Sequence, residues 1–151
     1  MVYSSSDIKS LIALAEKNAI NIIPEVDSIS GMRSWVQSPD WKDKNITINC
    51  PATEGFPKYC HQIDPSKGIA LQLAQDVMNE IDNLFKNSPY LHLGGSKIRY
   101  SCWDSRPSIK NTFMKLHNIK NYDGLIDYWR FELKQSLPSS RKLIYLMDQA
   151  R

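Results

Sequence analysis

The chain has 151 residues, 42% of them hydrophobic and 23% charged, which suits a globular domain with a substantial core and excludes a disordered chain. Its 19 basic and 16 acidic residues leave a formal charge of +3, and because the basic residues are scattered we expect no nucleic-acid partner. No apolar run approaches the roughly 20 residues of a membrane span, and Met1–Ser6 lacks the basic-then-apolar order of a signal peptide.

A helix and a strand are predicted in the first 24 residues. Ser6 can cap a helix that begins at Asp7, and apolar residues then recur at helical spacing through Ile8, Leu11, Ile12 and Ala15. The pattern changes to a β-branched run over 20–23, ended by Pro24, which predicts a buried strand. Residues 27–67 show no sustained period and hold four of the eight prolines, so we expect a long loop there.

Helices and strands alternate in the rest of the chain. A helix is predicted through Leu73, Val77, Ile81, Leu84 and Phe85, followed by a strand over 90–93 and a loop over 96–106. A helix then begins at Pro107 and carries Ile109, Phe113 and Leu116. A further helix over 122–137 and a strand over 143–147 complete the predicted order. Strands separated by helices are parallel, because each crossover returns the chain to the same end of the sheet. The sequence therefore predicts an α/β fold with three consecutive parallel strands and flanking helices.

Long loops follow the predicted strands, at the carboxyl ends where parallel α/β proteins place their chemistry. The polar residues of these loops and strand ends are Glu25, Asp27, Arg33, His92, Ser96, Lys97 and Asp148. For His92, inside an apolar strand, a hydrogen-bonded core role is favoured over a ligand role. We expect Glu25 to pair with a polar group of a neighbouring strand end. For Asp27, a sugar-binding role and a loop-capping role are equally favoured.

The three cysteines, Cys50, Cys60 and Cys102, form no C-x-x-C pair. A structural zinc site is therefore not expected, and nothing in the sequence calls for another metal or a cofactor. The odd number is compatible with one disulfide and a free thiol, or with three reduced thiols. Asn45-Ile46-Thr47 is an N-glycosylation acceptor triplet, which applies only if the chain enters the secretory pathway.

Several segments resemble glycoside hydrolase family 20, the β-N-acetylhexosaminidases, and follow the order of that family. The family stretch V-Y-T-x-x-D…V-I-P-E-F-D-T-P-G-H-T-R-S-W is similar to Val2-Tyr3-Ser4, Asp7, Ile22-Ile23-Pro24-Glu25-Val26-Asp27 and Arg33-Ser34-Trp35. Its L-N-P segment is similar to Ile63-Asp64-Pro65, and its H-L-G-G-D-E…C-W signature to His92-Leu93-Gly94-Gly95 and Cys102-Trp103. The resemblance extends over essentially the whole chain.

The resemblance implies a (β/α)8 TIM barrel, of which residues 1–151 form a partial catalytic-barrel segment, since a complete barrel takes roughly 250 residues. It implies a glycan partner with terminal non-reducing β-linked N-acetylhexosamine, and a lysosomal or secreted location. In such enzymes the substrate's acetamido oxygen attacks the anomeric carbon. The Asp of the D-E pair orients the acetamido group, and the Glu protonates the leaving oxygen. Uncovered barrel edges would also favour self-association.

The chain departs from the family where that chemistry is carried out. The D-E pair is replaced by Ser96-Lys97, the family His aligns with Gly31, and the tryptophan of the acetamido pocket aligns with Leu146. We therefore expect a hexosaminidase-like pseudoenzyme that retains Asp27 and His92 as candidate substrate-binding residues. The alternatives are a non-catalytic carbohydrate-binding or interaction module, and an active hexosaminidase that completes its barrel with another chain.

The resemblance also implies a disulfide. In animal and protist members of the family, the cysteine before the tryptophan of the C-W pair, here Cys102, bonds to the preceding long loop. Cys50 is the favoured partner and Cys60 the alternative. Such a bond requires an oxidising compartment, and Trp103 is expected to pack against the loop of Cys102.

Overall fold

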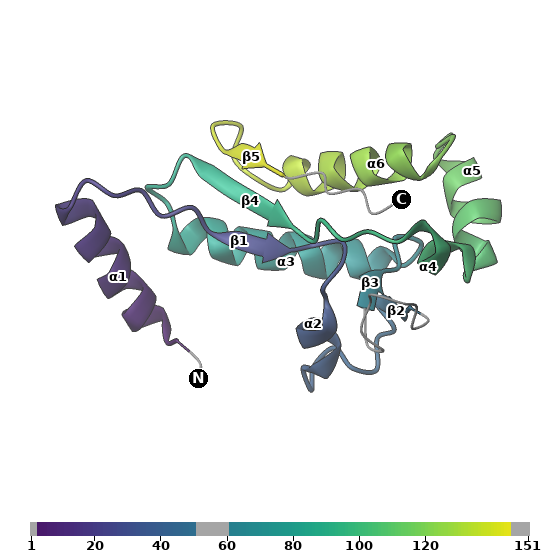
Figure 1. The fold of residues 1–151 in the computed structure, drawn as a ribbon, viewed down its shortest axis with the longest axis horizontal. Helices are drawn as coiled ribbons and strands as arrows, with labels where there is room; N and C mark the ends of the chain where they lie inside the picture. Colours follow the sequence, from purple (N-terminus) through teal and green to yellow (C-terminus); the bar gives the residue numbers. More distant parts are fainter. Residues whose placement is uncertain (1–2, 51–60, 146–151) are drawn as a thin grey trace.

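The computed structural model describes residues 3–50 and 61–145 (Figure 1). The helices within these residues are α1 (Ser5–Lys17), α2 (Arg33–Gln37), α3 (Gly68–Leu84), α4 (Tyr100–Asp104), the π-helical η1 (Ile109–Phe113), α5 (Met114–Leu116) and α6 (Tyr122–Gln135). The strands are β1 (Glu25–Asp27), β2 (Thr47–Asn49), β3 (His61–Ile63), β4 (Tyr90–Gly94) and β5 (Lys142–Ile144).

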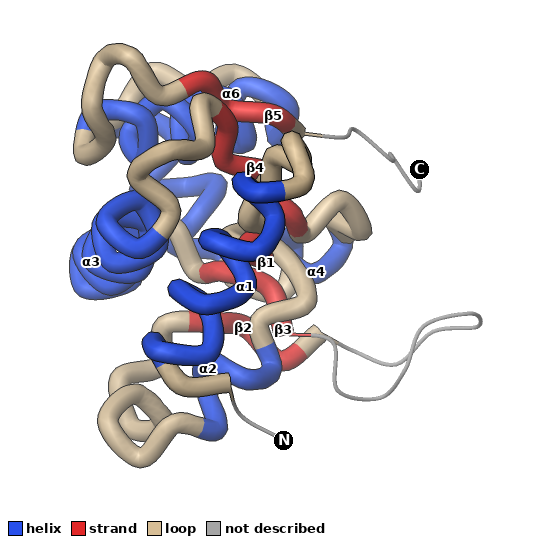
Figure 2. Tube along the Cα trace, turned by 90° about the vertical axis from the view of Figure 1, so that its left-hand side faces the viewer, coloured by secondary structure: helices blue, strands red, loops and turns tan. Residues whose placement is uncertain are grey.

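A parallel sheet of order β1-β4-β5 lies at the centre of the fold. This confirms the predicted α/β fold and the three parallel strands. Helix α3 connects to β4 and helix α6 to β5, and the two helices contact each other, with Gln75 Nε2 donating to Glu132 O at 3.0 Å. Figure 2 shows α3 to one side of the strands. Within the described residues β1 and β5 each pair on one side only, so the sheet is open and does not close into a barrel.

The pleat of this sheet separates an apolar face from a polar one. Leu91 and Leu93 of β4 are buried in the same cluster as Ala74 and Met78 of α3 and Trp129 of α6. Aligned residues of parallel strands share a face, and the register pairs Glu25 with His92 and Asp27 with Gly94. The opposite face therefore carries Glu25, Asp27, Tyr90, His92 and Lys142. This polar face is where the candidate site lies.

Helix α1 forms as predicted, but its N-cap is Ser4 and not Ser6. The reason is a capping box, in which Ser4 Oγ accepts from the backbone N of Asp7 at 3.2 Å and the Asp7 carboxylate accepts from the backbone N of Ser4 at 2.8 Å. None of its residues is buried, and it contacts α3 and the turn after it, where Asn87 Nδ2 donates to Glu16 Oε1 at 2.6 Å.

The first strand begins five residues later than the β-branched run predicts. Residues 20–23 are outside any strand, and Ile20 and Ile23 are 58% and 44% exposed, so the prediction of a buried strand there is wrong. Pro24 has no N–H to donate, and the pairing begins when its carbonyl accepts from the backbone N of His92 at 2.9 Å. Strand β1 follows Pro24 directly.

The predicted loops contain short elements that sequence periodicity does not detect. Residues 27–67 hold α2 and an antiparallel ribbon of β2 and β3, and residues 96–106 hold α4. Each of these elements is three to five residues long, too short for a period to be recognised. The segment from Pro107 buries Ile109 as predicted, but Leu116 is 78% exposed at its end. The last strand begins at Lys142, and Leu146, Met147 and Asp148 lie outside the described residues.

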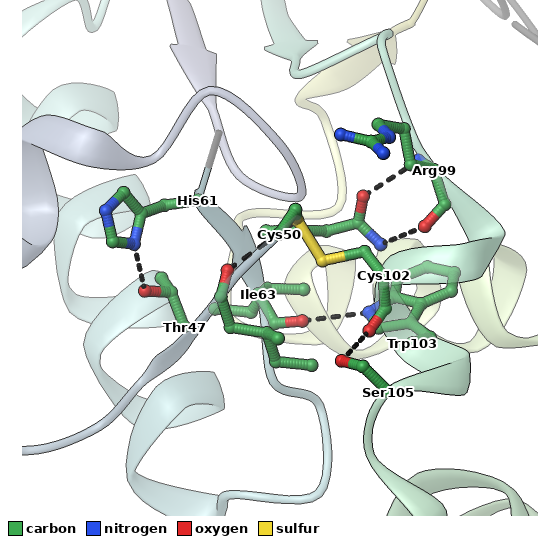
Figure 3. Close-up of a disulfide and its surroundings, with 10 residues drawn as sticks. Thr47, Cys50, His61, Ile63, Arg99, Cys102, Trp103 and Ser105 are labelled. Carbon is green, nitrogen blue, oxygen red and sulfur yellow. Dashed lines mark hydrogen bonds between the residues drawn. A yellow bond between two sulfur atoms is a disulfide. The ribbon is translucent and has the colours of Figure 1, made fainter. Parts of the chain in front are cut away.

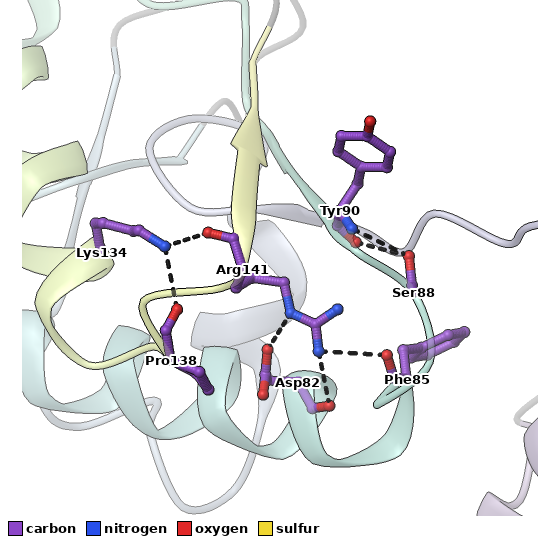
Figure 4. A network of polar contacts seen from close by, with 7 residues as sticks. All are labelled: Asp82, Phe85, Ser88, Tyr90, Lys134, Pro138 and Arg141. Carbon is purple, nitrogen blue, oxygen red and sulfur yellow. Dashed lines mark hydrogen bonds and ion pairs between the residues drawn. The ribbon is translucent and has the colours of Figure 1, made fainter.

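The amino end of the sheet is held by a buried ion pair (Figure 4). Arg141, just before β5, pairs with the Asp82 carboxylate of α3, and both side chains are at least 88% buried. The same guanidinium donates to the carbonyls of Asp82 and Phe85 at 3.4 and 3.3 Å. Lys134 donates to the carbonyls of Pro138 and Arg141. Three polar side chains and four backbone carbonyls thus fix the turn from α6 into β5 against the end of α3.

Candidate active-site face

Asp27 lies at the carboxyl end of β1, on the polar face of the sheet, and its side chain is packed over two glycines. A Cβ atom at Gly31 would lie 2.5 Å from Asp27 Oδ2, and one at Gly94 would lie 2.5 Å from Asp27 Oδ1. Gly94 is also the register partner of Asp27. The carboxylate therefore occupies the space that side chains at these two positions would need.

Gly31 and Gly95 also have backbone conformations that favour glycine. Their φ angles are +76° and +78°, in the left-handed region. A Cβ at Gly95 would lie 2.8 Å from the backbone N of Ser30, so the turn after β4 packs directly on the turn after β1. At Gly31, where the resemblance places the family His, the backbone conformation and the nearby Asp27 carboxylate both favour glycine.

His92 of β4 and Glu25 of β1 form a pair across the strands. His92 Nδ1 lies 3.1 Å from Glu25 Oε2, an ion-pair distance without the alignment of a hydrogen bond. The histidine side chain is 14% exposed and the glutamate side chain 61% exposed. The prediction that Glu25 pairs with a polar group of a neighbouring strand is confirmed, and the pair lies on the same face as Asp27.

Ser96 and Lys97 follow the Gly94-Gly95 turn. Ser96 is half-buried and Lys97 is exposed, while Ile98 and Arg99, the next two residues, are 8% and 6% exposed. The backbone N of Ile98 donates to the Ser96 carbonyl at 2.9 Å, which turns the chain inward directly after Lys97. Among the described residues, no hydrogen bond or ion pair joins Ser96 or Lys97 to Asp27 or His92.

A disulfide joins Cys50, after β2, to Cys102 in α4 (Figure 3). Both half-cystines are buried, at 2% and 0% exposure. This is the pair that the family resemblance favours, and Cys60 lies outside the described residues. The bond connects the ribbon of β2 and β3 to the segment that carries Ser96 and Lys97.

Two further contacts reinforce the disulfide (Figure 3). The side-chain amide of Gln62 donates to the Arg99 carbonyl at 3.0 Å and accepts from the Arg99 backbone N at 2.8 Å. Trp103 Nε1 donates to the Ile63 carbonyl at 2.9 Å, and the tryptophan is 1% exposed. Trp103 therefore packs beside Cys102 as predicted. Gln62 is fully buried, and no sequence pattern pointed to its role.

Strand β3 also holds the turn that follows β1. The backbone N of Ile63 donates to the Ile29 carbonyl at 2.7 Å, and the backbone N of Met32 donates to the His61 carbonyl at 3.2 Å. On the other side of this turn, Trp129 Nε1 donates to the Ser28 carbonyl at 3.1 Å. Both loops at the carboxyl ends of β1 and β4 are therefore fixed to the same short ribbon.

The ribbon holds a histidine of its own. His61 Nδ1 lies 3.1 Å from Thr47 Oγ1, across the β2–β3 pair. Burial lowers the pKa of His61, and the nearby Arg33 charge lowers it further. The neutral imidazole is therefore favoured in the folded chain, which suits a structural hydrogen bond.

The described residues contain no group of three or more His, Cys, Asp or Glu side chains placed to hold a metal ion. None of the helices that the structure describes is long and apolar enough to cross a membrane. The arrangement that the structure does provide is two exposed carboxylates, Asp27 and the His92-paired Glu25, beside loops joined by a disulfide.

Parallel strands joined by helices, with long loops at their carboxyl ends, are typical of α/β proteins, which include the α/β barrels. The sequence matches the pattern described as "Glycosyl hydrolase family 20, catalytic domain" over residues 1–148. The chain therefore belongs to glycosyl hydrolase family 20.

Known relatives are longer than this chain. The beta-hexosaminidase subunit beta of Rattus norvegicus is 30% identical over 93% of this chain and 25% of its own length. The beta-hexosaminidase subunit B1 of Dictyostelium discoideum is 27% identical over 97% of this chain and 29% of its own length. The chain thus spans less than a third of either relative.

Solved structures share the fold. The crystal structure of a beta-N-acetylhexosaminidase matches 95% of this chain and 30% of its own, with a TM-score of 0.72 at 19% identity. An exo beta-N-acetylglucosaminidase from Vibrio harveyi, in complex with N-acetylglucosamine, matches 95% of this chain and 22% of its own, with a TM-score of 0.68. At these identities the likeness establishes the fold alone.

Proposed function

We propose that this chain is a hexosaminidase-like protein that does not hydrolyse N-acetylhexosaminides. The observation that carries the proposal is the turn after Gly94-Gly95, where the family signature has an Asp-Glu pair and this chain has Ser96 and Lys97. Residues 1–151 then correspond to a partial catalytic-barrel segment whose catalytic pair has been replaced.

The replacement removes both catalytic contributions of the pair. A serine cannot balance the positive charge that develops on the sugar when its acetamido oxygen attacks. An ammonium group has an ordinary pKa near ~10.4, which is poorly matched to proton donation at neutral pH. A lysine would also repel the developing cation by about 4 kcal/mol at ~4 Å and an effective dielectric near ~20. General acid catalysis alone is worth roughly 10²–10⁴ in rate.

The surroundings of Asp27 support the same conclusion. Gly31 has a left-handed backbone, and a side chain there would meet the Asp27 carboxylate at 2.5 Å. A histidine at this position would need both the backbone and Asp27 to rearrange. These features support the proposed loss of the family His, because a histidine at Gly31 would need further changes around it.

The test is the release of a chromophore from N-acetyl-β-glucosaminide and N-acetyl-β-galactosaminide substrates by the purified chain. We expect no release above the rate of the blank. The double variant Ser96→Asp/Lys97→Glu should remain inactive, because it restores neither the family His nor the sugar contacts that other barrel strands supply. Release by the unmodified chain that is lost in Lys97→Ala would contradict the proposal.

Sugar binding without hydrolysis is a second candidate, favoured by the exposed Asp27 carboxylate on the polar face. A solved relative binds N-acetylglucosamine, and a strand-end carboxylate can accept a hydrogen bond from a sugar hydroxyl. Titration calorimetry with N-acetylglucosamine distinguishes the two. Heat of binding that disappears in Asp27→Ala supports a binding module, and equal heats for both proteins show that Asp27 holds no sugar.

A further inference from the structure

The turn before β2 presents an asparagine whose side chain is exposed. Asn45 has a φ of +50°, a left-handed conformation that asparagine adopts more readily than most residues. The next two residues are buried, because Ile46 is 0% and Thr47 9% exposed. Asn45-Ile46-Thr47 is the single N-x-S/T triplet in the whole sequence.

The disulfide ties this triplet to an oxidising compartment. Cys50 lies five residues after Asn45 and is bonded to Cys102 in the buried core of the ribbon. Structural disulfides of this kind persist in secreted and endoplasmic-reticulum proteins, and N-linked glycans are attached in the same pathway. The disulfide indicates that pathway, and the exposure of Asn45 is a separate observation that is compatible with a glycan at this position.

We propose that Asn45 is the acceptor of an N-linked glycan, and that the glycan is attached before β2 pairs with β3. The donor is an oligosaccharide linked through N-acetylglucosamine to a lipid pyrophosphate. A bond forms between Asn45 Nδ2 and the anomeric carbon of that N-acetylglucosamine, while the bond from this carbon to the pyrophosphate oxygen breaks. The lipid pyrophosphate leaves with the electron pair, and the amide nitrogen loses one proton to the transferase or solvent.

The order of events follows from the state of Thr47 in the folded chain. Its hydroxyl is the third-residue group that defines the triplet, yet Thr47 Oγ1 lies 3.1 Å from His61 Nδ1 in a side chain that is nearly buried (Figure 3). Thr47 also pairs with Ile63 across the ribbon, and Cys50 then bonds to Cys102. A transferase can reach the hydroxyl only while this ribbon is open.

The folded structure accommodates the product. The Asn45 side chain faces solvent at a turn, and neither Asp27 nor the Glu25–His92 pair is in contact with it. A glycan at this position is therefore compatible with the fold and independent of sugar hydrolysis. The proposal succeeds or fails separately from the proposed loss of hexosaminidase activity.

The test is in-vitro glycan transfer to the full chain, with microsomal oligosaccharyltransferase and its lipid-linked donor. Two acceptors are compared, the folded chain with its disulfide intact and the chain reduced and unfolded. We expect the unfolded chain to gain one endoglycosidase-sensitive glycan by intact mass, and the folded chain to react at least tenfold more slowly.

Two variants locate the site. Asn45→Asp tolerates the same left-handed backbone but lacks the amide, and it should accept no glycan in either state. Thr47→Ser retains a hydroxyl at the third position and should still be modified when unfolded. No transfer to the unfolded chain, or transfer that persists in Asn45→Asp, overturns the site. Equal rates for the folded and unfolded chains overturn the proposed order of events.

Discussion

The two ends of the parallel sheet are held together by different kinds of interaction. At the amino end, the Asp82–Arg141 ion pair and a set of carbonyl contacts join α3 to the turn before β5. At the carboxyl end, the Cys50–Cys102 disulfide and the Gln62–Arg99 hydrogen bonds join the ribbon to α4. In barrel enzymes the carboxyl end carries the chemistry and the amino end the stability. Here both ends carry interactions that stabilise the fold.

The largest expected effect comes from breaking the carboxyl end. Removing the disulfide in Cys102→Ala should lower the free energy of unfolding by about 4 kcal/mol in the chain-entropy treatment, because the two cysteines are 52 residues apart. Guanidinium denaturation followed by circular dichroism measures this loss. The unmodified chain in reductant serves as the control and should lose a similar amount. A loss below ~1 kcal/mol would show that the hydrogen bonds alone fix these loops.

Breaking the amino end should have a slightly smaller effect. Asp82→Ala leaves the Arg141 guanidinium, 7% exposed, without its carboxylate, and breaking a buried pair in this way costs about 3–5 kcal/mol. We expect the lower limit, because Arg141 keeps its contacts to the Asp82 and Phe85 carbonyls. Removal of the exposed Asp127 partner of Arg130 by Asp127→Ala is the matched control and should cost less than ~1 kcal/mol.

A substitution at Gly31, beside Asp27, tests how firmly the turn at the carboxyl end is packed. Gly31→Ala should destabilise the chain by about 1–2 kcal/mol, because a residue with a Cβ pays this amount for a left-handed backbone. Gly68→Ala is the control, since a Cβ at Gly68 meets nothing within 4 Å. Thermal unfolding of both variants should show a loss for the first alone. A neutral Gly31→Ala would mean that the turn can relax and that the packing over Asp27 is not fixed.

The ribbon should also make stability depend weakly on pH. The pKa of folded His61 lies below its unfolded value near ~6.5, so the unfolded chain binds more protons in the window below that value. The stabilisation from neutral His61 is therefore complete above about pH 6.5 and is lost as the pH falls through the folded pKa. Urea midpoints between pH 5 and 8 should fall more steeply on acidification for the unmodified chain than for His61→Gln. Parallel curves would contradict this.

Sequence periodicity predicted the parts of the fold that are long enough to show it. Helices α3 and α6, of 17 and 14 residues, each bury one face, and the alternation of helices with strands required the parallel sheet. The sequence did not predict the ribbon and α4, because each element is only three to five residues long and is stabilised by partners far away in the chain. The buried Gln62 contacts Arg99, 37 residues later. No local pattern encodes such a contact.

The sequence predicted which residues form the candidate site, but it did not predict how they pack together. Strand-end position identified Asp27, Glu25 and His92, and the register then showed that they share one face. The role of Gly31 and Gly94 depends on the Asp27 side chain lying over both, which only the structure reveals. The adjacent glycines Gly94-Gly95 were the one sequence signal of a close approach between the two turns.

We propose that the carboxyl end of this sheet has lost its catalytic role and keeps a structural one. The most direct measurement is the rate at which purified chain releases a chromophore from an N-acetyl-β-glucosaminide, compared with the Asp27→Asn variant under the same conditions. We expect both proteins to release chromophore at the rate of the blank. A rate above the blank that falls to background in Asp27→Asn would contradict it.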